Sequence, residues 1–599
     1  MPVPPYVPLR DYAPIGDGRT VALLRGDATV DWLPIARHDS EPVFARLLDA
    51  EGGGFIALRP TEPFKTRRAY VPGTNVLQTT FCTARGSARL TDALVTGFAG
   101  RLSWVELVRR VEGLEGEVPF AWQVEPGTRL ATASPWTEDS LHGSLLSSDG
   151  VVISVRGCAH GSERRGPRDV RGRFTARAGS RHVLVVAGAE DGPVHVPVPE
   201  LSDEGLDRTI QAWQRWSCDF RYDGPWAPAV QRSALMLKLL MHEPTGAIAA
   251  AATTSLPENL EGGKNWDYRF GWIRDAAFTV EALIRFGLRE EPHAAVAWLL
   301  RAIKRHGPRL HIFYALDGSL PGGVHERSVP GWRGVGPVVA GNRANDQMQF
   351  GIFGDLMKLM RVYVQAGNLL DADSAQLLRT LADEALGLWR QEDSGIWELP
   401  EARHYTSSKM GCWQALIEAA RLHELGAIDG PAAHWRAEAE VIRAWVLDHC
   451  WSQQLGSYTA WAGGDSLDAS VLLHAASGFD CGPRMAGTIR ALQRGLARGP
   501  LMYRYSGMER EEGCFVACSF WLAAALALTG QVEEATALME QMLAQANDVG
   551  VYAEMIDPQD DSFLGNLPQG LSHLALINAA LTIAECRKGK RESRPDTGS

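Results

Sequence analysis

The sequence has little cysteine, no excess of positive charge and none of several common catalytic motifs. Its nine cysteines among 599 residues form no CxxC pair, which is typical of a reducing compartment and not of a disulfide framework. The net charge of −11 disfavours a broad nucleic-acid-binding surface, because such surfaces need clustered Lys and Arg. HExxH, EF-hand, Walker A, GxSxG and dinucleotide-binding patterns are missing too. We therefore expect no metal, no cofactor and no nucleic-acid partner.

Long hydrophobic runs are also scarce. The longest uncharged apolar stretch, residues 514–528, is shorter than the roughly 18 residues that indicate a membrane span. The N-terminal residues show no basic segment followed by an apolar one, which a secretory signal needs. We therefore expect a cytoplasmic protein without a membrane partner, and the sequence predicts no particular oligomeric state.

What is present fits a large globular protein with two differently patterned regions. Apolar residues make up 45% and charged residues 22%, which is close to the globular average. Residues 19–188 contain short β-branched or alternating runs, such as VVISVRG and HVLVVAG, between turn-forming residues. This pattern predicts an N-terminal antiparallel β-sandwich within residues 1–200. The amphipathic segment 203–216 predicts a linker helix within 201–224.

Beyond residue 225 the hydrophobic period changes to 3.6, which predicts about twelve helices. Their expected starts lie near Ala227, Trp272, Pro292, Asn345, Ala372, Ser407, Pro431, Leu467, Pro483, Cys514, Val532 and Gln569. Short connections alternate with long ones, so in a closed ring of helical hairpins the long ones would open on one face. We predict an (α/α)6 barrel catalytic domain over residues 225–586 and a polar basic tail over 587–599.

The long connections are rich in Trp, Tyr, Arg, Asp and Glu. Examples are NWDYRFGWIRDA (265–276), DSGIWELPEARHYTSSK (393–409), MYRYSGMEREEG (502–513) and VYAEMIDPQDD (551–561). Aromatic rings stack on the C–H faces of sugars and charged planar groups bind sugar hydroxyls, so this mixture favours a carbohydrate pocket. The alternative is that these residues only seal one end of the barrel.

Two glutamates in these connections are candidates for glycoside hydrolysis. The reaction needs one protonated carboxyl that donates to the leaving oxygen and one ionised carboxylate on the opposite face. Glu398 follows Ile396 and Trp397, and an apolar neighbourhood raises the pKa of a carboxyl, so Glu398 is the candidate acid. Glu554, about 155 residues later, is the candidate base. The alternative for each is a helix cap or a salt bridge.

Five long segments carry a resemblance to a known family. They are residues 15–49, 265–276, 395–413, 504–528 and 564–581, which include NWDYRFGWIRDA, GIWELPEARHYTSSKMGCW and LGNLPQGLSHLALINAAL. Together they resemble the signature blocks of bacterial glycoside hydrolase family 15, which includes glucoamylase-like enzymes and bacterial α,α-trehalases. The resemblance implies a β-sandwich followed by an (α/α)6 domain. It also implies an exo-acting, anomer-inverting attack on α-glucosides.

The family blocks imply roles for individual residues of this sequence. Glu398 in the WE block corresponds to the general acid and Glu554 to the base that activates water. Arg274 and Asp275 in the RD block would hold the terminal glucose by its far hydroxyls, and Arg504 would bind the same ring as a second fork. Other implied binding residues are Trp266, Asp267, Trp397 and Tyr505 in the pocket wall, and Trp332 and Arg333 in the loop expected to meet the leaving sugar.

Substrate choice is the most open part of the prediction. The loop around residues 322–334 is shorter than the family loop, and His38 stands where an aromatic residue is common. The favoured function is a glucoamylase- or α-glucosidase-type hydrolase that releases β-glucose from the nonreducing end of α-glucosides. The alternative is an α,α-trehalase. A more distant alternative is an inverting disaccharide phosphorylase, which needs a phosphate site in place of the second carboxylate. The third class is a non-catalytic sugar-binding or structural protein.

Overall fold

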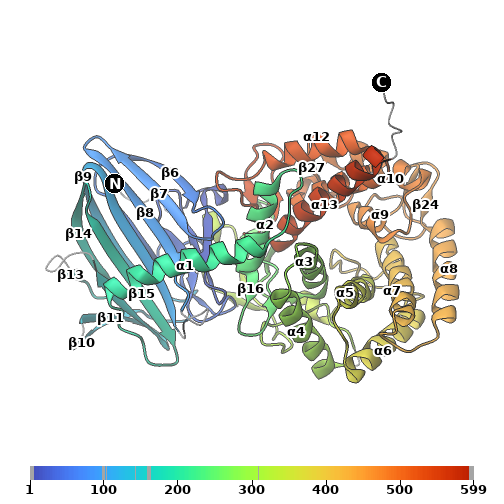
Figure 1. The fold of residues 1–599 in the computed structure, drawn as a ribbon, viewed down its shortest axis with the longest axis horizontal. Helices are drawn as coiled ribbons and strands as arrows, with labels where there is room; N and C mark the ends of the chain where they lie inside the picture. Colours follow the sequence, from blue (N-terminus) through green and yellow to red (C-terminus); the bar gives the residue numbers. More distant parts are fainter. Residues whose placement is uncertain are drawn as a thin grey trace.

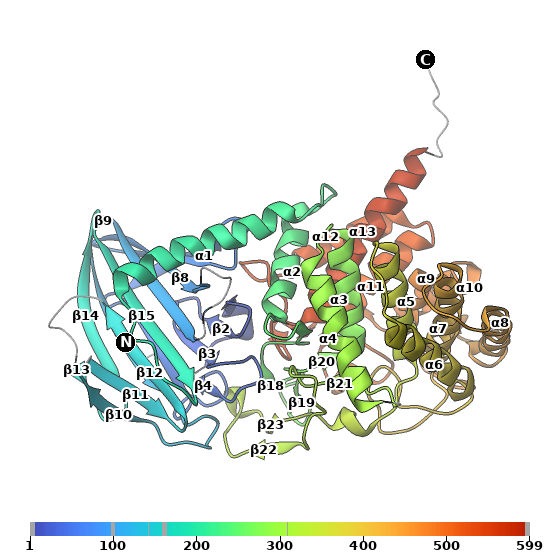
Figure 2. The ribbon, with the colours of Figure 1, turned by 60° about the horizontal axis from the view of Figure 1, so that its bottom comes forward.

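The computed structural model describes residues 6–592 except 98–101, 103, 142, 158–163 and 308. A β-rich region and a helical region lie side by side, and helix α1 (Pro199–Asp219) connects them (Figure 1). Figure 2 shows α1 running along the strands toward the helices. Its buried residues Leu206 and Trp213 fit the amphipathic linker helix that the sequence predicts. No helix among the described residues has the length and apolarity needed to span a membrane.

The β-rich region contains an antiparallel network of fifteen strands within the described residues. Its strands are β1 (Ala13–Gly16), β2 (Val21–Leu24), β3 (Val30–Pro34), β4 (Pro42–Phe44), β5 (Gly54–Pro60), β6 (Phe64–Tyr70), β7 (Leu77–Thr83), β8 (Gly86–Leu94), β9 (Val105–Pro126), β10 (Trp136–Ser140), β11 (Gly143–Ser148), β12 (Val151–Gly157), β13 (Arg164–Arg165), β14 (Val170–Arg177) and β15 (Arg181–Glu190).

Strand β9 ties this network together. Its first half pairs with β8 and β15, and its second half pairs with β5 and β14. The change of partners falls near Gly113 and Gly116. Gly116 has a φ of +60°, and a Cβ there would lie 2.1 Å from the carbonyl oxygen of Arg85, so only glycine fits this bend. The strand therefore belongs to two differently directed parts of the network.

Among the described residues, the helical region contains twelve further helices. They are α2 (Ala227–Leu240), α3 (Ile273–Arg285), α4 (Glu290–His306), α5 (Gly351–Gln365), α6 (Ala372–Leu388), α7 (Thr406–Glu424), α8 (Ala432–His449), α9 (Leu473–Ser477), α10 (Pro483–Gly495), α11 (Val516–Leu528), α12 (Val532–Leu543) and α13 (Gly570–Glu592). The short helical turns are η1 (Leu9–Asp11), η2 (Trp332–Gly334), η3 (Arg343–Asp346), η4 (Ala469–Leu472) and η5 (Met508–Arg510).

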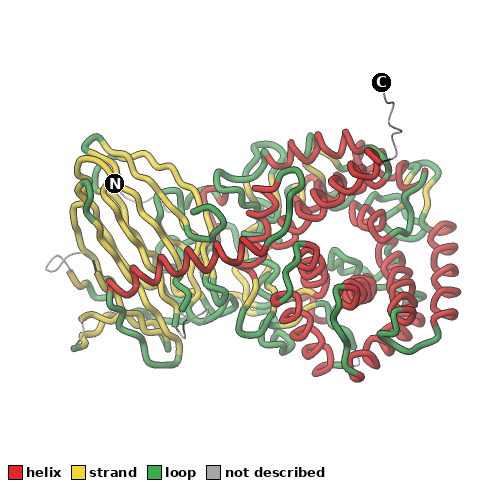
Figure 3. Tube along the Cα trace, viewed as in Figure 1, coloured by secondary structure: helices red, strands yellow, loops and turns green. Residues whose placement is uncertain are grey.

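Short strands occupy the connections between these helices (Figure 3). They are β16 (Met241–His242), β17 (Ala247–Ile248), β18 (Thr254–Pro257), β19 (Asn265–Asp267), β20 (Gly271–Trp272), β21 (Phe313–Tyr314), β22 (His325–Arg327), β23 (Val338–Ala340), β24 (Trp451–Ser452), β25 (Ser457–Tyr458), β26 (Ala497–Arg498), β27 (Leu501–Met502), β28 (Cys514–Phe515), β29 (Met555–Ile556) and β30 (Phe563–Leu564).

Contacts between the helices follow a repeated order. α3 packs on α5, α5 on α7, α7 on α9, α9 on α11, α11 on α13, and α13 on α3, so these helices close a ring. The other helices, α2, α4, α6, α8, α10 and α12, pack against members of this ring. The most apolar ring helix is α11, which is buried along most of its length. This explains why residues 514–528 form the longest apolar stretch of the sequence.

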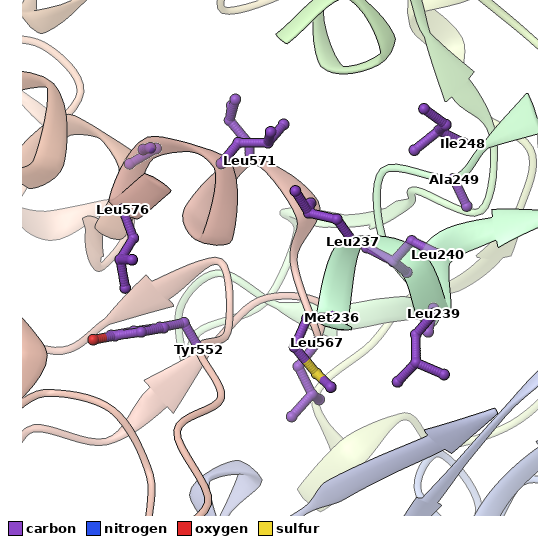
Figure 4. Close-up of a cluster of buried hydrophobic side chains, with 14 of the residues drawn as sticks. Met236, Leu237, Leu239, Leu240, Ile248, Ala249, Tyr552, Leu567, Leu571 and Leu576 are labelled. Atoms are coloured by element: carbon purple, nitrogen blue, oxygen red, sulfur yellow. The ribbon is translucent and has the colours of Figure 1, made fainter. Parts of the chain in front are cut away.

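The first and last helices of this region share one hydrophobic core. Met236 and Leu237 of α2 lie beside Leu567 and Leu571, which flank the start of α13 (Figure 4). Burying a side chain of this size stabilises a protein by about 1.5–3 kcal/mol. This contact joins the two ends of the helical region in the sequence.

Helix α13 continues to Glu592, so the first six residues of the predicted tail are helical. The guanidinium of Arg587 donates to Thr536 at 2.7 Å and lies 5.4 Å from the ring of Trp226. These contacts extend the helix beyond the predicted end of its domain. Residues 593–599 lie outside the described residues.

Candidate active site

A pocket lies in the connections that lead into the ring helices. Eight of the eleven predicted site residues line it, namely Trp266, Arg274, Asp275, Trp397, Glu398, Arg504, Tyr505 and Glu554. They come from the segments before or at the start of α3, α7, α11 and α13. Residues separated by almost 290 positions in the sequence therefore meet in one cavity.

Glu398 lies in the connection between α6 and α7. Its φ of +59° is in the left-handed region, which residues other than glycine seldom adopt. The carboxylate Oε1 accepts a hydrogen bond from Nε1 of Trp272 at 2.9 Å, and the backbone oxygen accepts one from Nε2 of Gln347 at 3.0 Å. Burial raises the pKa of Glu398, and this outweighs the opposing effects of Trp272 and Arg274. A raised pKa suits a proton donor.

Glu554 lies directly before β29 and is only 1% exposed. Its backbone N–H donates to the oxygen of Asn566 at 3.0 Å, and the N–H of Asn566 donates to Oε2 of Glu554 at 3.2 Å. Gly565 has a φ of +70°, and a Cβ there would lie 2.5 Å from Oε2 of Glu554, so the carboxylate needs a glycine beside it. Burial, and then the nearby charge of Glu258, raise the pKa of Glu554 well above its usual range.

Arg504 holds two buried carboxylates next to Glu554. Its Nε donates to Oε1 of Glu512 at 2.6 Å and its Nη2 donates to Oε2 of Glu258 at 2.9 Å. Lys264 adds an ion pair to Glu512 at 2.9 Å. Burial raises the pKa of Glu258 to about 7 despite Arg504, whereas the pKa of Glu512 is lowered because its two cations outweigh burial. We expected the guanidinium group of Arg504 to bind the sugar, but its Nε and Nη2 are bound to carboxylates of the protein.

Arg274 and Asp275 lie side by side in the first turn of α3. The Nε and Nη2 of Arg274 contact Oδ2 of Asp275 at 3.1 and 3.0 Å, and Nη1 donates to the oxygen of Ile396 at 3.4 Å. Asp275 is 3% exposed. The pair thus forms a charged, planar and deeply placed part of the pocket wall, which suits the binding of sugar hydroxyls.

Aromatic rings form much of the remaining wall. Trp397 donates from Nε1 to Oδ1 of Asp468 at 2.8 Å, which fixes its ring. The ring lies 6.4 Å from Tyr505 and 5.5 Å from the guanidinium of Arg504. Trp266 lines the pocket and accepts, at its backbone oxygen, a hydrogen bond from Asn566 at 2.9 Å. These rings offer the apolar faces on which pyranose C–H groups stack.

Three predicted site residues do not line the pocket. Asp267 is 1% exposed and is held by Arg269 through Oδ1 and Oδ2 at 2.9 Å each. Trp332 is 2% exposed and donates from Nε1 to the oxygen of Val7 at 3.1 Å, while Arg333 stacks on the Trp332 ring at 4.3 Å. The N-terminal segment thus covers the face of the loop that we expected to meet the leaving sugar.

The structure adds pocket residues that the sequence analysis did not single out. Tyr268 and Trp272 line the pocket, and their rings lie 5.3 Å apart. Burial and the neighbouring Glu554 raise the pKa of Tyr268 well above its usual range, so its hydroxyl remains a donor at neutral pH. Gln347 and Lys264 line the pocket as well. Tyr268 and Trp272 stand in the NWDYRFGWIRDA block, and their aromatic character was the available signal.

Within the described part of the chain, no group of three or more His, Cys, Asp or Glu side chains is arranged to hold a metal ion. Asp275 pairs with Arg274, and the buried Glu258 and Glu512 pair with Arg504. The arrangement therefore offers carboxylates, guanidinium groups and aromatic rings as its chemical groups.

Comparison with known proteins places this geometry in a family. The model of glycosyl hydrolases family 15 matches residues 224–581, and a trehalase-like N-terminal model matches residues 6–138. The chain belongs to glycosyl hydrolase family 15. This confirms the resemblance found in the sequence, and the chain is a glycoside hydrolase. The predicted inverting mechanism is consistent with this family.

Two similar curated proteins are trehalases. The chain is 32% identical to the trehalase of Mycobacterium tuberculosis over 97% of its own length and 90% of that protein. It is 30% identical to the trehalase of Thermoplasma volcanium, covering 97% and 94% of the two chains. Among solved structures, a bacterial glucoamylase complexed with acarbose matches 98% of this chain and 97% of its own, with a TM-score of 0.71 at 13% identity. That structure therefore shares the fold.

Proposed function

We propose that this family 15 enzyme is an α,α-trehalase. The observation that carries the proposal is the similarity of about 30–33% over nearly the whole chain to proteins named trehalase, together with the match of residues 6–138 to a trehalase-like N-terminal model. The same finding contradicts the glucoamylase- or α-glucosidase-type function that the sequence analysis favoured. The likeness to a glucoamylase shows a shared fold and gives no information about the substrate.

The two carboxyls in the pocket support a one-step hydrolysis. Glu398 gives its proton to the oxygen between the two glucose units, and the bond from that oxygen to the anomeric carbon breaks. A water attacks the same carbon from the opposite face and gives its proton to Glu554. The attacked sugar leaves as β-glucose and the other as α-glucose. Inverting pairs are about 6.5–9.5 Å apart, because the water must fit between base and sugar.

The rest of the pocket supports an exo-acting enzyme. We propose that Arg274 and Asp275 hold the far hydroxyls of the attacked glucose and that Trp397 packs against its face. Arg504 contributes through its one remaining nitrogen and keeps Glu258 and Glu512 in place. The deep position of Asp275 and the exposed position of Arg343 give the pocket a closed end and an open end.

The finer description of the fold is also a proposal. The two halves of β9, each with its own partners, support a β-sandwich in residues 1–200. The closed order of helix contacts from α3 to α13 supports an (α/α)6 barrel in residues 225–586. Helix α1 would then be the linker between the two domains, within residues 201–224.

The test compares substrates and product anomers. Purified protein is incubated with trehalose, maltose, isomaltose and soluble starch, and early products are followed by proton NMR. We expect kcat/KM for trehalose to exceed that for each other substrate by at least about tenfold, with α- and β-glucose released in equal amounts. A preference for maltose or starch would refute the trehalase proposal, and early release of α-glucose alone would refute inversion.

A further inference from the structure

Asp267 connects two parts of the pocket wall, although its own side chain does not line the pocket. It ends strand β19 and stands between Trp266 and Tyr268, which both line the pocket. Oδ2 of Asp267 accepts a hydrogen bond from the N–H of Gly341 at 3.2 Å, and the backbone oxygen of Asp267 accepts one from Nδ2 of Asn342 at 3.3 Å. Because Gly341 and Asn342 lead into turn η3, these bonds join β19 to the turn. Strand β19 also packs against β23, between the β-rich region and the helices (Figure 2).

The carboxylate of Asp267 is fixed by a buried arginine. Nε and Nη2 of Arg269 donate to Oδ1 and Oδ2 of Asp267 at 2.9 Å each, and the backbone N–H of Arg269 donates to Oδ1 at 3.1 Å. Asp267 and Arg269 are only 1% and 2% exposed. Nη1 of Arg269 donates to the backbone oxygen of Ser40 in the β-rich region at 3.0 Å. A bidentate pair holds its partners in one orientation, so β19 and η3 are anchored to the β-rich region.

Turn η3 carries a pocket residue whose side chain is available to a ligand. Arg343 lines the pocket and is exposed at its open end. Within the described residues, its guanidinium takes part in no hydrogen bond or ion pair. In an exo-acting enzyme the attacked glucose lies at the closed end, beside Asp275, so a side chain at the open end meets the second glucose. A guanidinium presents five donors in a planar fork, which suits neighbouring hydroxyl oxygens of that sugar.

We propose that Asp267 is a positioning residue that fixes turn η3, so that Arg343 at the open end of the pocket binds hydroxyls of the second glucose. The proposal rests on the trehalase function proposed above, because trehalose supplies that second glucose. The role differs from the one expected from the sequence, since Asp267 acts through the turn and contacts no sugar itself. A turn that is already fixed when the substrate arrives loses little entropy on binding.

A double-mutant cycle in the full-length protein tests this route. kcat and KM for trehalose are measured for the wild type, Asp267→Asn, Arg343→Ala and the double variant. In Asp267→Asn the amide nitrogen faces two donors in either orientation, so the bonds at one of the two oxygens are lost. We expect KM to rise about tenfold in Arg343→Ala and about fivefold in Asp267→Asn, with kcat nearly unchanged. The double variant should have a KM within about twofold of that of Arg343→Ala, because the two changes remove the same interaction.

A substrate with a single glucose unit separates the open end from the rest of the pocket. The KM for α-glucosyl fluoride should change by less than about twofold in each variant, and its hydrolysis shows that the variants are folded. Asn342→Ala loosens the same turn without leaving a buried charge unpaired, and it should also raise the KM for trehalose. Asp346→Asn is the matched control, because it removes a charge from the exposed side of the turn outside the pocket, and both KM values should stay at the wild-type level.

Each outcome decides the proposal. If Asp267→Asn raises the KM for trehalose as much in the Arg343→Ala background as alone, the two residues act independently and the proposal is overturned. An unchanged KM in either single variant would also overturn it. Equal rises for trehalose and α-glucosyl fluoride would mean that Asp267 only supports the pocket as a whole. If the wild type hydrolyses maltose but not trehalose, the trehalase proposal fails, and the same cycle with maltose still decides the role of Asp267.

Discussion

The two sides of the pocket place a glutamate in very different surroundings. On one side, Glu398 is partly exposed and its carboxylate receives one hydrogen bond, from the indole of Trp272. On the other, Glu554 is 1% exposed and lies beside Arg504 and two further buried carboxylates, Glu258 and Glu512. The first environment allows Glu398 to exchange a proton with solvent. The second surrounds Glu554 with buried charged groups.

This difference fits the two proposed tasks. An acid that donates in every turnover must regain its proton from water, which partial exposure permits. A base must be ionised when substrate arrives, and near Glu554 three carboxylates share two cations, Arg504 and Lys264. Burial and the charge of Glu258 raise the pKa of Glu554, so the charge on Glu258 opposes the ionised form that the base needs.

The largest effect is expected when the proposed base, Glu554, is replaced. Glu554→Gln removes the group that activates water, so hydrolysis of trehalose should fall by about 10³-fold, within the usual range for general base catalysis. Hydrolysis of α-glucosyl fluoride should fall similarly, because it also needs an activated water. Initial rates of glucose release measure both. Near wild-type rates on either substrate would rule out Glu554 as the base, and trehalose binding by calorimetry checks that the pocket is intact.

Replacing the proposed acid, Glu398, should slow hydrolysis of trehalose much more than hydrolysis of α-glucosyl fluoride. Glu398→Gln removes the proton donor, and trehalose hydrolysis should fall by about 10²-fold or more. The loss on α-glucosyl fluoride should be much smaller, because fluoride departs without protonation. The measurement is the ratio of kcat/KM on the two substrates.

Glu401→Gln is the control for this change, since Glu401 lies on the same loop, is exposed and pairs with Arg403. Its ratio of kcat/KM values should stay at the wild-type value. Equal losses on both substrates in Glu398→Gln would contradict the role of Glu398 as acid.

The helices were well predicted because their signals are local. The expected starts at Ala227, Ala372, Pro483 and Val532 coincide with those of α2, α6, α10 and α12. In each case a change from turn residues to a 3.6-residue apolar period marks the boundary. The start expected near Asn345 was early, since residues 343–346 form turn η3 and α5 begins at Gly351.

The site was predicted less completely because its decisive contacts are distant in sequence. The hydrogen bond from Trp272 to Glu398 joins residues 126 positions apart, and that from Arg504 to Glu258 joins residues 246 apart. No local pattern reports such pairings. The family resemblance implied that Trp332 lies in the loop that meets the leaving sugar, but a loop sequence does not show which of its faces another segment covers.

The smallest effect is expected from a change beside the proposed base that leaves Glu554 in place. Glu258→Gln deletes a negative charge that raises the pKa of Glu554 and leaves Arg504 more available to it. Both changes favour the ionised form, so the pKa of Glu554 should fall. Because the base acts when ionised, the acidic limb of the kcat/KM profile for trehalose should move to lower pH, with a smaller loss of maximal rate than in Glu554→Gln. Glu509→Gln, a surface pair with Arg498, should leave the limb in place, and a shift to higher pH in Glu258→Gln would show that this cluster does not control the base.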